Sequence, residues 1–270
     1  MSTPRRSPAP RPDLHDGFRD PRRAPAGELA EFLEAADRLP GFRAVQQAMR
    51  RALDPRPGMR LLDAGCGARL ETARLAADHP DTLVTGLDRN ADLLRIARRR
   101  TAANLRWVHA DLAEDPVPPA SYDAVRTERV LMYLPDDRLR RALDGLIAAL
   151  RPGGRLALFE LDYGATILAP PMDRVADALR DSLPQPLAGR RLPGLLRERG
   201  LREVSAEPFS FAVSEPVWRR IVNDTVTAAA PPTPDVAAWL SESGAAVARG
   251  EFVAAFTGIL TSARRGQAAS

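Results

Sequence analysis

The chain has 270 residues, of which 44% are hydrophobic and 27% charged, a composition typical of one large globular α/β domain. No apolar run approaches the ~18 residues that span a membrane, no secretory segment is visible, and a single cysteine excludes an internal disulfide. All 39 basic residues are arginine, and residues 1–27 carry +3 of the formal net charge of +4, which leaves +1 for the remaining chain. We therefore expect a soluble, cytoplasmic protein that has neither a nucleic acid nor a membrane as its partner.

The composition of the chain changes near residue 28, where apolar residues begin to recur at helical spacing. Residues 1–27 contain six prolines and few large apolar side chains, which predicts a disordered tail rich in proline and arginine. From residue 28 onward a single domain, 28–270, is expected. Its first part, 28–57, repeats apolar residues at helical spacing and predicts two N-terminal helices; the repeating residues are Leu29, Phe32, Leu33, Ala36, Val45, Met49 and Leu53.

Strands and helices then alternate through residues 58–162, the expected core. The predicted strands are 59–65, 82–88, 105–111, 122–128 and 155–162, and the predicted helices are 71–78, 91–102 and 137–154, the last closed by glycines. This alternation is typical of a doubly wound, Rossmann-like parallel sheet covered by helices on both faces. Ligands of such sheets bind at the carboxyl ends of the strands.

The last third departs from this alternation. Helices are predicted at 170–183, 190–200, 216–230 and 233–250, with strands at 201–213 and 251–265. We interpret 163–200 and 214–250 as helical cap elements. The second could close over the site as a lid or could simply bury apolar surface, and the sequence leaves both roles open.

The strongest motif is the stretch "RLLDAGCGARLETARLA", residues 60–76. Gly65 and Gly67 follow a predicted strand and precede a helix, where the backbone must turn sharply and approach a ligand closely. Asp88 follows the second strand, 21 residues beyond Gly67, in position to accept hydrogen bonds from two ribose hydroxyls. A dinucleotide site would have a third glycine where Leu70 stands, whereas S-adenosylmethionine has no pyrophosphate and does not require it. Asp111 follows the third strand, where it could accept from an adenine amine.

The chain resembles the class I S-adenosylmethionine-dependent methyltransferases. The resemblance is to the small-molecule branch similar to ubiquinone/menaquinone-biosynthesis enzymes and bacterial natural-product methyltransferases. It rests on "LLDAGCG", "TGLDRNADLLRIARRR", "HADLAEDPVPPASYDAVRTERVLMYLPD", "LRPGGRLALFELD" and "GRRLPGLLRERGL". It implies a seven-stranded sheet whose last strand is antiparallel, S-adenosylmethionine as cofactor, and no metal.

The resemblance also implies which residues hold the cofactor. Asp63, Ala64, Gly65 and Gly67 are implied to line the methionine side, Asp88 and Arg89 the ribose, Asp111 and Leu112 the adenine, and Thr127, Glu128 and Arg129 the floor beside the sulfonium. Arg69 stands where the family usually has its third glycine, and we expect it at the methionine end of the cofactor. Cys66 is interpreted as a small residue that fills the turn rather than as a nucleophile.

The acceptor is predicted to be a small molecule bound between the fourth and fifth strands and the cap. Candidate lining residues are Tyr133, Asp162, Tyr163, Arg190 and Trp218, and candidate catalytic groups are Tyr133, Glu160, Tyr163 and His109. None of the three histidines is a persuasive base, and His15 falls in the predicted tail. The expected function is methyl transfer in natural-product biosynthesis by in-line displacement, which depends mainly on alignment. A methyltransferase fold used for cyclisation, rearrangement or binding alone is the alternative, and a homodimer is left open.

Overall fold

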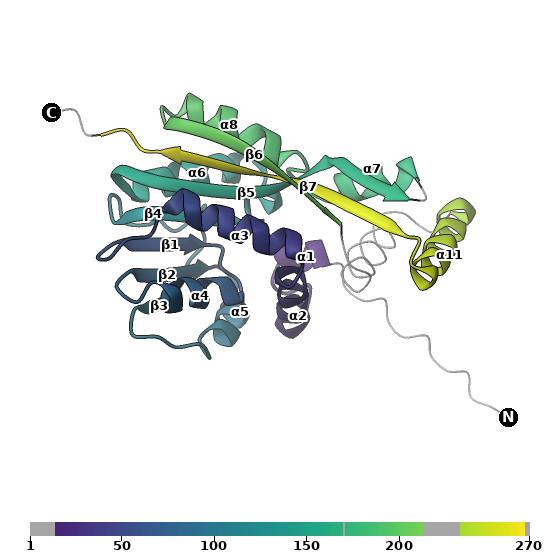
Figure 1. Cartoon of the computed structure of the whole chain (residues 1–270), viewed down its shortest axis with the longest axis horizontal. Coiled ribbons are helices and arrows are strands. Elements are labelled where there is room, and N and C mark those ends of the chain that lie inside the picture. Colours follow the sequence, from purple (N-terminus) through teal and green to yellow (C-terminus); the bar gives the residue numbers. More distant parts are fainter. Residues whose placement is uncertain (1–13, 170, 213–232, 268–270) are drawn as a thin grey trace.

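The fold is built on one seven-stranded mixed sheet (Figure 1). The computed structural model describes residues 14–169, 171–212 and 233–267. The strand order is β3-β2-β1-β4-β5-β7-β6. The strands are β1 (Arg60–Ala64), β2 (Leu83–Asp88), β3 (Leu105–His109), β4 (Tyr122–Glu128), β5 (Leu150–Ala169), β6 (Arg202–Ala212) and β7 (Val253–Arg264). β1 to β5 pair in parallel, whereas β7 runs antiparallel to both β5 and β6. The predicted sheet with an antiparallel last strand is confirmed.

Along the central strands β1, β2, β4 and β5, side chains are buried on both faces of the sheet. On β5, Phe159 points to a core that contains Phe42 and Met49 of α3 (Pro40–Leu53), while Leu158 points to a core formed with α6 (Asp136–Ala149) and α8 (Ala188–Glu198). This alternation is the period of two expected of strands that are covered on both sides. The other helices near the strand ends are α2 (Ala26–Asp37), α4 (Leu70–Asp78), α5 (Ala91–Ala97) and the 3₁₀ turn η1 (Leu131–Tyr133).

Part of the predicted disordered tail is ordered in the structure. Residues 14–19 form the helix α1 (Leu14–Arg19), which packs against α2 and η1. His15 and Gly17 are buried, and a Cβ at Gly17 would lie 2.5 Å from the Cβ of Ala24, so this helix fits closely against the following turn. Composition misled the prediction for residues 14–27 because this short segment uses an existing aromatic surface rather than a core of its own. Residues 1–13 lie outside the described residues.

The helix predicted at 137–154 is shorter than expected. It ends at Ala149, and Leu150 to Gly154 already belong to β5. Leu150 pairs with Tyr122, and the amide N–H of Gly153, whose φ is +77°, donates to the carbonyl oxygen of Arg265. Sheet pairing, rather than a helical C-cap, therefore explains these glycines.

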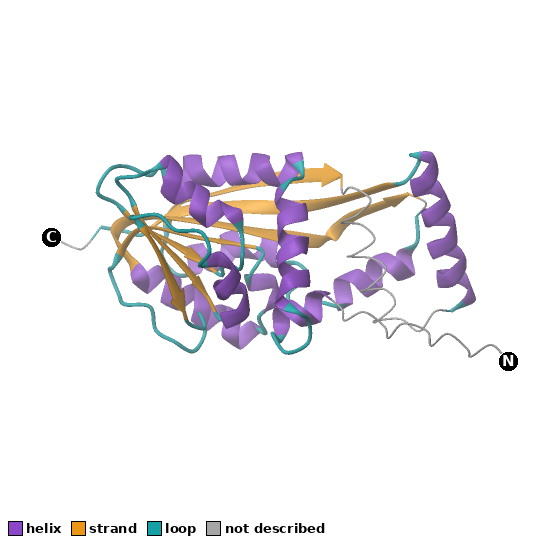
Figure 2. Cartoon of the chain, turned by 90° about the horizontal axis from the view of Figure 1, so that it is seen from below, coloured by secondary structure: helices purple, strands orange, loops and turns teal. Residues whose placement is uncertain are grey.

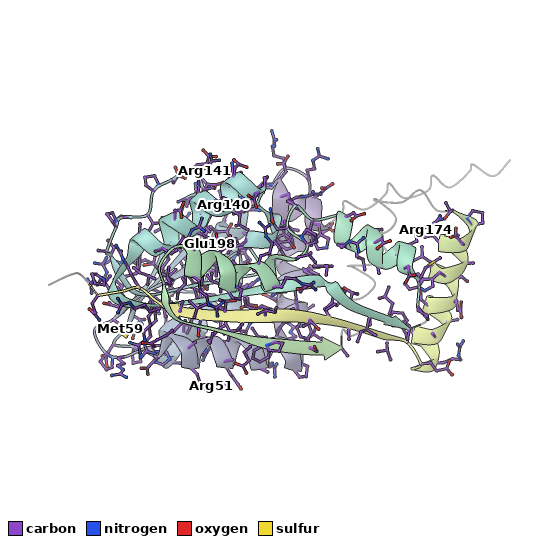
Figure 3. The ribbon with its side chains drawn as sticks, turned by 90° about the horizontal axis from the view of Figure 1, so that it is seen from above. Arg51, Met59, Arg140, Arg141, Arg174 and Glu198 are labelled. Carbon is purple, nitrogen blue, oxygen red and sulfur yellow. The ribbon has the colours of Figure 1, made fainter. Side chains whose placement is uncertain are left out.

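The expected cap regions differ in role. β5 continues from Asp162 to Ala169 and β7 pairs with this extension, so the two strands form a ribbon that leaves the core (Figures 1 and 2). At its end, α7 (Asp173–Asp181) is joined to α11 (Pro234–Arg249) by Arg174, whose Nη1 donates to Thr233 Oγ1 at 3.2 Å (Figure 3). α8 instead covers the sheet. The predicted helix 216–230 lies outside the described residues, and the described helices include none long and apolar enough to cross a bilayer.

Candidate functional site

A tight turn at the carboxyl end of β1 opens the site. Gly65 and Gly67 both have positive φ, at +72° and +56°. A Cβ at Gly65 would lie 2.4 Å from Cγ2 of Val130, which is closer than any side chain tolerates, so glycine is required there. Between them Cys66 is buried, and burial raises the pKa of its thiol well above the usual value. The thiol is thus a packing group within the turn.

Asp88 at the end of β2 is fixed toward the same turn. Its Oδ2 accepts from the amide N–H of Gly67 at 2.7 Å, and its Oδ1 accepts from that of Asn90 at 2.8 Å. Burial raises the pKa of Asp88, and these two backbone donors oppose that shift. The carboxylate is therefore held in one orientation at the strand ends, which is the arrangement that a ribose-binding acid requires.

Asp111 occupies the corresponding place after β3. Its Oδ2 accepts from Arg138 at 2.8 Å and lies 3.7 Å from a guanidinium nitrogen of Arg89, while its Oδ1 accepts from the amide N–H of Ala113. His109, the last residue of β3, is exposed, and its Nε2 lies 2.9 Å from the carbonyl oxygen of Arg89. The position of Asp111 is thus set by its own loop and by two arginines.

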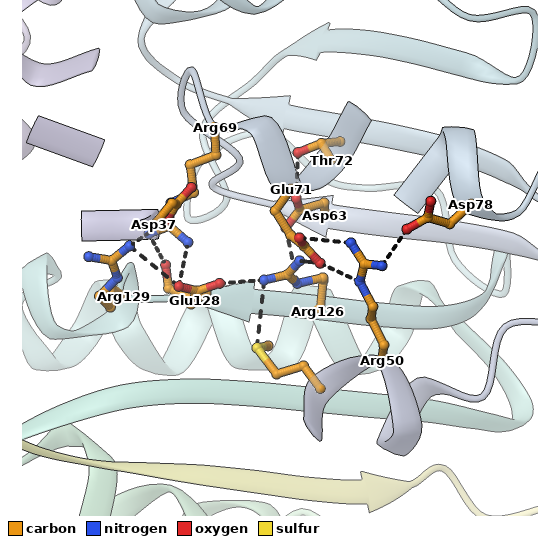
Figure 4. A network of polar contacts seen from close by, with 11 residues as sticks. Asp37, Arg50, Asp63, Arg69, Glu71, Thr72, Asp78, Arg126, Glu128 and Arg129 are labelled. Carbon is orange, nitrogen blue, oxygen red and sulfur yellow. Dashed lines mark hydrogen bonds and ion pairs between the residues drawn. The ribbon is translucent and has the colours of Figure 1, made fainter. Parts of the chain in front are cut away.

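Arg69, the residue in place of the third glycine, belongs to a buried ionic network (Figure 4). Only 4% of Arg69 is exposed; its Nη1 lies 3.1 Å from Oε1 of Glu128, and its Nη2 donates to the carbonyl oxygen of Glu128 at 2.8 Å. Arg126 pairs with Oε2 of the same carboxylate at 2.5 Å. Burial opposes ionisation of Glu128, but the surrounding arginines outweigh it and lower the pKa of this carboxyl.

Arg129 extends the network toward α2 and α3. Its Nη2 lies 3.2 Å from Oδ1 of Asp37, and its guanidinium carbon lies 4.0 Å from the ring centroid of Phe42. Arg129 has a φ of +57°, an uncommon conformation for a residue with a side chain, which turns the chain after β4. Burial raises the pKa of Asp37 to about 6, although Arg69 and Arg129 oppose the shift.

These elements enclose one cavity of about 1160 Å³, its open mouth included. Ten of the predicted site residues line it: Gly65, Gly67, Arg69, Asp88, Arg89, Asp111, Leu112, Arg129, Tyr133 and Tyr163. The predicted residues Asp63, Ala64, Thr127, Glu128, His109, Glu160, Asp162 and Arg190 do not contribute to its lining. Trp218 lies outside the described residues.

Several of the predicted residues that do not line the cavity form contacts directly behind its lining residues. Asp63 accepts from Thr72 Oγ1 at 2.6 Å and lies 3.5 Å from Arg126. Asp162 forms a two-pronged ion pair with Arg190, with oxygen–nitrogen distances of 2.5 and 2.8 Å. Both carboxylates are nearly fully buried, and each is balanced by an arginine: Arg126 is buried, whereas the side chain of Arg190 is 51% exposed.

Glu160 is fully buried and supports η1 from behind. Its Oε1 accepts from the amide N–H groups of Val130 and Leu131 at 2.9 and 2.8 Å, and its Oε2 accepts from that of Met132 at 3.3 Å. Burial raises the pKa of Glu160 to about 7, and the three backbone donors oppose the shift. Because η1 ends at Tyr133, this carboxyl fixes the backbone that presents the tyrosine to the cavity.

The part of the cavity beyond the strand ends is aromatic. The sequence did not indicate most of its lining, which includes His15, Phe18, Phe32, Phe42, Phe211 and Phe256. The helical period over residues 28–57 included Phe32 as an apolar-face residue and could have revealed Phe42 in the same way, but α1 carries no such periodic signal. Apolar walls with few polar groups are typical of a small-molecule pocket.

Comparison with known proteins agrees with this geometry. A family model described as "Methyltransferase domain" matches residues 61–154. The chain is 32% identical to the 27-O-demethylrifamycin SV methyltransferase of Amycolatopsis mediterranei over 77% of this chain and 73% of that protein. The chain belongs to the class I S-adenosylmethionine-dependent methyltransferases.

Other relatives share shorter stretches. The trans-aconitate 2-methyltransferase of Deinococcus radiodurans is 34% identical over 54% of this chain and 47% of its own length. The chain spans about half the length of several of the curated relatives that it matches.

Two solved structures share the methyltransferase fold. One is phosphoethanolamine N-methyltransferase 2 of Haemonchus contortus in complex with S-adenosyl-L-methionine, with a TM-score of 0.63, 17% identity and coverage of 94% of this chain and 60% of that one. The other is the [4+2]-cyclase SpnF, with a TM-score of 0.55, 21% identity and coverage of 83% and 81%.

Proposed function

We propose that this protein, as a single methyltransferase domain over residues 28–270 with α1 added, transfers the methyl group of S-adenosylmethionine to an apolar small molecule. The observation that carries the proposal is that one cavity joins the turn at Gly65 and Gly67, the acids Asp88 and Asp111, and an aromatic chamber. The two glycines allow the tight turn that brings the backbone to the cavity, and the two acids offer acceptors for ribose hydroxyls and an adenine amine. The residues present therefore fit the family's cofactor.

In this proposal Arg69 and Arg129 face the methionine end of the cofactor. Both side chains line the cavity, and Glu128 and Asp37 hold them from behind. The carboxylate of the cofactor's methionine part could therefore accept hydrogen bonds from the two guanidinium groups. Asp63, Ala64, Thr127 and Glu128 stand behind the wall and would act by holding the lining in place.

The bound cofactor supplies a methyl group on a sulfonium that is already activated for in-line displacement. The protein's own task is then to align the acceptor and to exclude water, and such alignment supplies about 7–11 kcal/mol of a barrier in well-ordered sites. The aromatic walls of the chamber, with Phe42, Phe211 and Phe256, suit an acceptor with an apolar body. The similarity to a methyltransferase that acts on a rifamycin supports a role in secondary metabolism.

The test is transfer of a labelled methyl group from S-adenosylmethionine to a metabolite extract of the organism that encodes the chain. We expect a labelled apolar product with the wild-type protein and much less of it with Asp88→Ala at a subsaturating cofactor concentration, because the carboxylate of Asp88 anchors the turn. Asp92→Ala is the matched control, because Asp92 is an exposed acid in the first turn of α5. Cofactor binding without any labelled product would instead favour a cyclisation or rearrangement on the same fold.

A further inference from the structure

We infer that His15 and Tyr133 form a proton relay in the acceptor chamber, and that the acceptor is therefore an alcohol or a phenol. This inference rests on the proposed function and narrows it to O-methylation. The two residues are 118 positions apart in the sequence, and His15 belongs to a helix that composition did not predict.

The two side chains meet inside the cavity. Nδ1 of His15 lies 3.1 Å from the hydroxyl oxygen of Tyr133, within hydrogen-bond distance, and the ring centroids are 5.7 Å apart. Both residues line the cavity, and only 4% of His15 is exposed. An imidazole nitrogen beside a phenolic hydroxyl is an arrangement that can take up a proton and pass it on.

Each member of the pair is fixed by a different part of the fold. On one side, a guanidinium nitrogen of Arg89 donates to the carbonyl oxygens of Phe18 and Arg19, which ties α1 to the loop that follows β2. On the other side, Glu160 accepts from three consecutive amides of the segment that leads into Tyr133. The pair is thus held in place before any acceptor binds.

The carboxylates near the aromatic part of the cavity have other hydrogen-bond or ion-pair partners. Glu160 lies behind the wall in its backbone hydrogen bonds, and Asp162 is paired with Arg190. Asp88 and Asp111 belong to the strand ends, where the cofactor is proposed to lie. Arg129 lies against the ring of Phe42 and is paired with Asp37, which does not line the cavity. The other titratable side chains among the described residues that line the aromatic part of the cavity are His15, Tyr133 and Tyr163.

The proton balance of the step follows from this geometry. As the acceptor oxygen forms its bond to the methyl carbon, the carbon–sulfur bond breaks and its electron pair stays on sulfur. The hydroxyl proton of the acceptor passes to the oxygen of Tyr133, and the proton of Tyr133 passes to Nδ1 of His15. After the product leaves, the Nδ1 proton of the imidazolium returns through the hydroxyl of Tyr133 to water in the open cavity, which restores both side chains. Tyr133 is the catalytic residue in this scheme, and His15 acts through it.

The relay also sets the chemical class of the acceptor. A hydroxyl must lose its proton as it attacks, whereas a neutral amine or a carbon nucleophile can attack first and lose a proton later. A built proton path inside an apolar chamber therefore fits a hydroxyl carried on an apolar body. Two further rings flank the pair: the centroid of Phe18 lies 5.5 Å from that of Tyr133, and the centroid of Tyr163 lies 6.1 Å from that of His15.

The first experiment needs no acceptor. The relay requires that Nδ1 of neutral His15 accepts from Tyr133, so its proton must be on Nε2. A long-range ¹H–¹⁵N spectrum of the ¹⁵N-histidine-labelled protein distinguishes the two tautomers. The chain has three histidines, and His15→Gln assigns the signal. We expect the Nε2–H pattern in the wild type and its loss or weakening in Tyr133→Phe. A proton on Nδ1 in the wild type would overturn the relay.

The second experiment measures the rate of labelled-methyl transfer to the metabolite extract and identifies the methylated atom. We expect Tyr133→Phe and His15→Gln to lower the initial rate by about 10²–10⁴-fold, the range of general base catalysis, with the calorimetric affinity for S-adenosylmethionine unchanged. Tyr122→Phe and His79→Gln are matched controls, since neither residue lines the cavity. A rate within threefold of wild type in Tyr133→Phe, or methylation at nitrogen or carbon, would overturn the inference. If the wild-type protein transferred no methyl group, that result would contradict the proposed function. The tautomer of His15, measured in the first experiment without any acceptor, would still test the relay.

Discussion

Replacement of Arg69 is the sharpest perturbation of the buried ionic network. Arg69→Met keeps an unbranched apolar stem but removes the charge, which leaves Glu128 without its bonds to Nη1 and Nη2. Loss of one partner from a buried ion pair costs about 3–5 kcal/mol. Arg126 and Arg129 remain 2.5 and 3.4 Å from the same carboxylate, so we expect the lower end of that range, about 3 kcal/mol.

The assay is urea unfolding at neutral pH, analysed as the free energy of unfolding. Arg95→Met is the matched control, because Arg95 pairs with Asp92 at 3.3 Å but both side chains are 67% exposed. Such a surface pair contributes at most about 1 kcal/mol. The double variant Arg69→Met/Glu128→Gln removes both opposite charges, and we expect it to be at least about 1 kcal/mol more stable than the sum of the single effects predicts.

A stability loss in Arg69→Met no larger than that in Arg95→Met would refute the reasoning, because it would mean that the buried pair contributes no more than a solvated one. Since Arg69 also lines the cavity, we expect the variant that remains folded to bind S-adenosylmethionine with an affinity changed by several-fold rather than abolished.

Three further predictions concern separate parts of the site. The pKa of Glu160 in the folded state, about 7, lies above its ordinary value of 4.5, so the stability that this carboxyl contributes is complete below pH 4.5 and is lost as the pH rises through 7. Urea unfolding should therefore show that the wild-type protein is less stable at pH 8 than at pH 5. This loss should be smaller in Glu160→Gln, by up to about 3 kcal/mol, and an equal loss in both proteins would contradict a raised pKa of Glu160. Arg89→Ala should increase amide hydrogen exchange in α1 at least tenfold, as two carbonyl contacts are lost, whereas unchanged exchange would mean that α1 docks without this clamp. Cys66 should resist iodoacetamide in the native protein and react after denaturation, and rapid native alkylation would contradict its burial.

The sequence predicted the elements whose signals are local. Periodic apolar strands separated by helices indicated the parallel core, and Gly65, Gly67 and Asp88 followed from their places after β1 and β2. The roles of these residues depend on the backbone at their own positions, so a few neighbouring residues of the sequence are enough to predict them. The antiparallel last strand came from the resemblance to a family rather than from periodicity.

The features that the sequence missed depend on partners distant in the chain. Arg69 and Glu128 are 59 residues apart, and nothing near either residue reveals that they pair. Glu160 was a candidate catalyst because it ends a strand, yet its partners are amides about 30 residues earlier. His15 was assigned to a disordered tail, because composition describes what a segment can bury by itself and not the surface on which it docks.

Calorimetric titration of the purified protein with S-adenosylmethionine tests the central claim most directly, because it asks whether the cavity at Gly65, Gly67 and Asp88 binds the cofactor of the family. We predict saturable binding to the wild type, and a weakening of about 10- to 150-fold in Asp88→Ala, which corresponds to a charge-assisted hydrogen bond of about 1.5–3 kcal/mol. Asp92→Ala should bind like the wild type. Absence of binding to the folded wild-type protein would contradict the account.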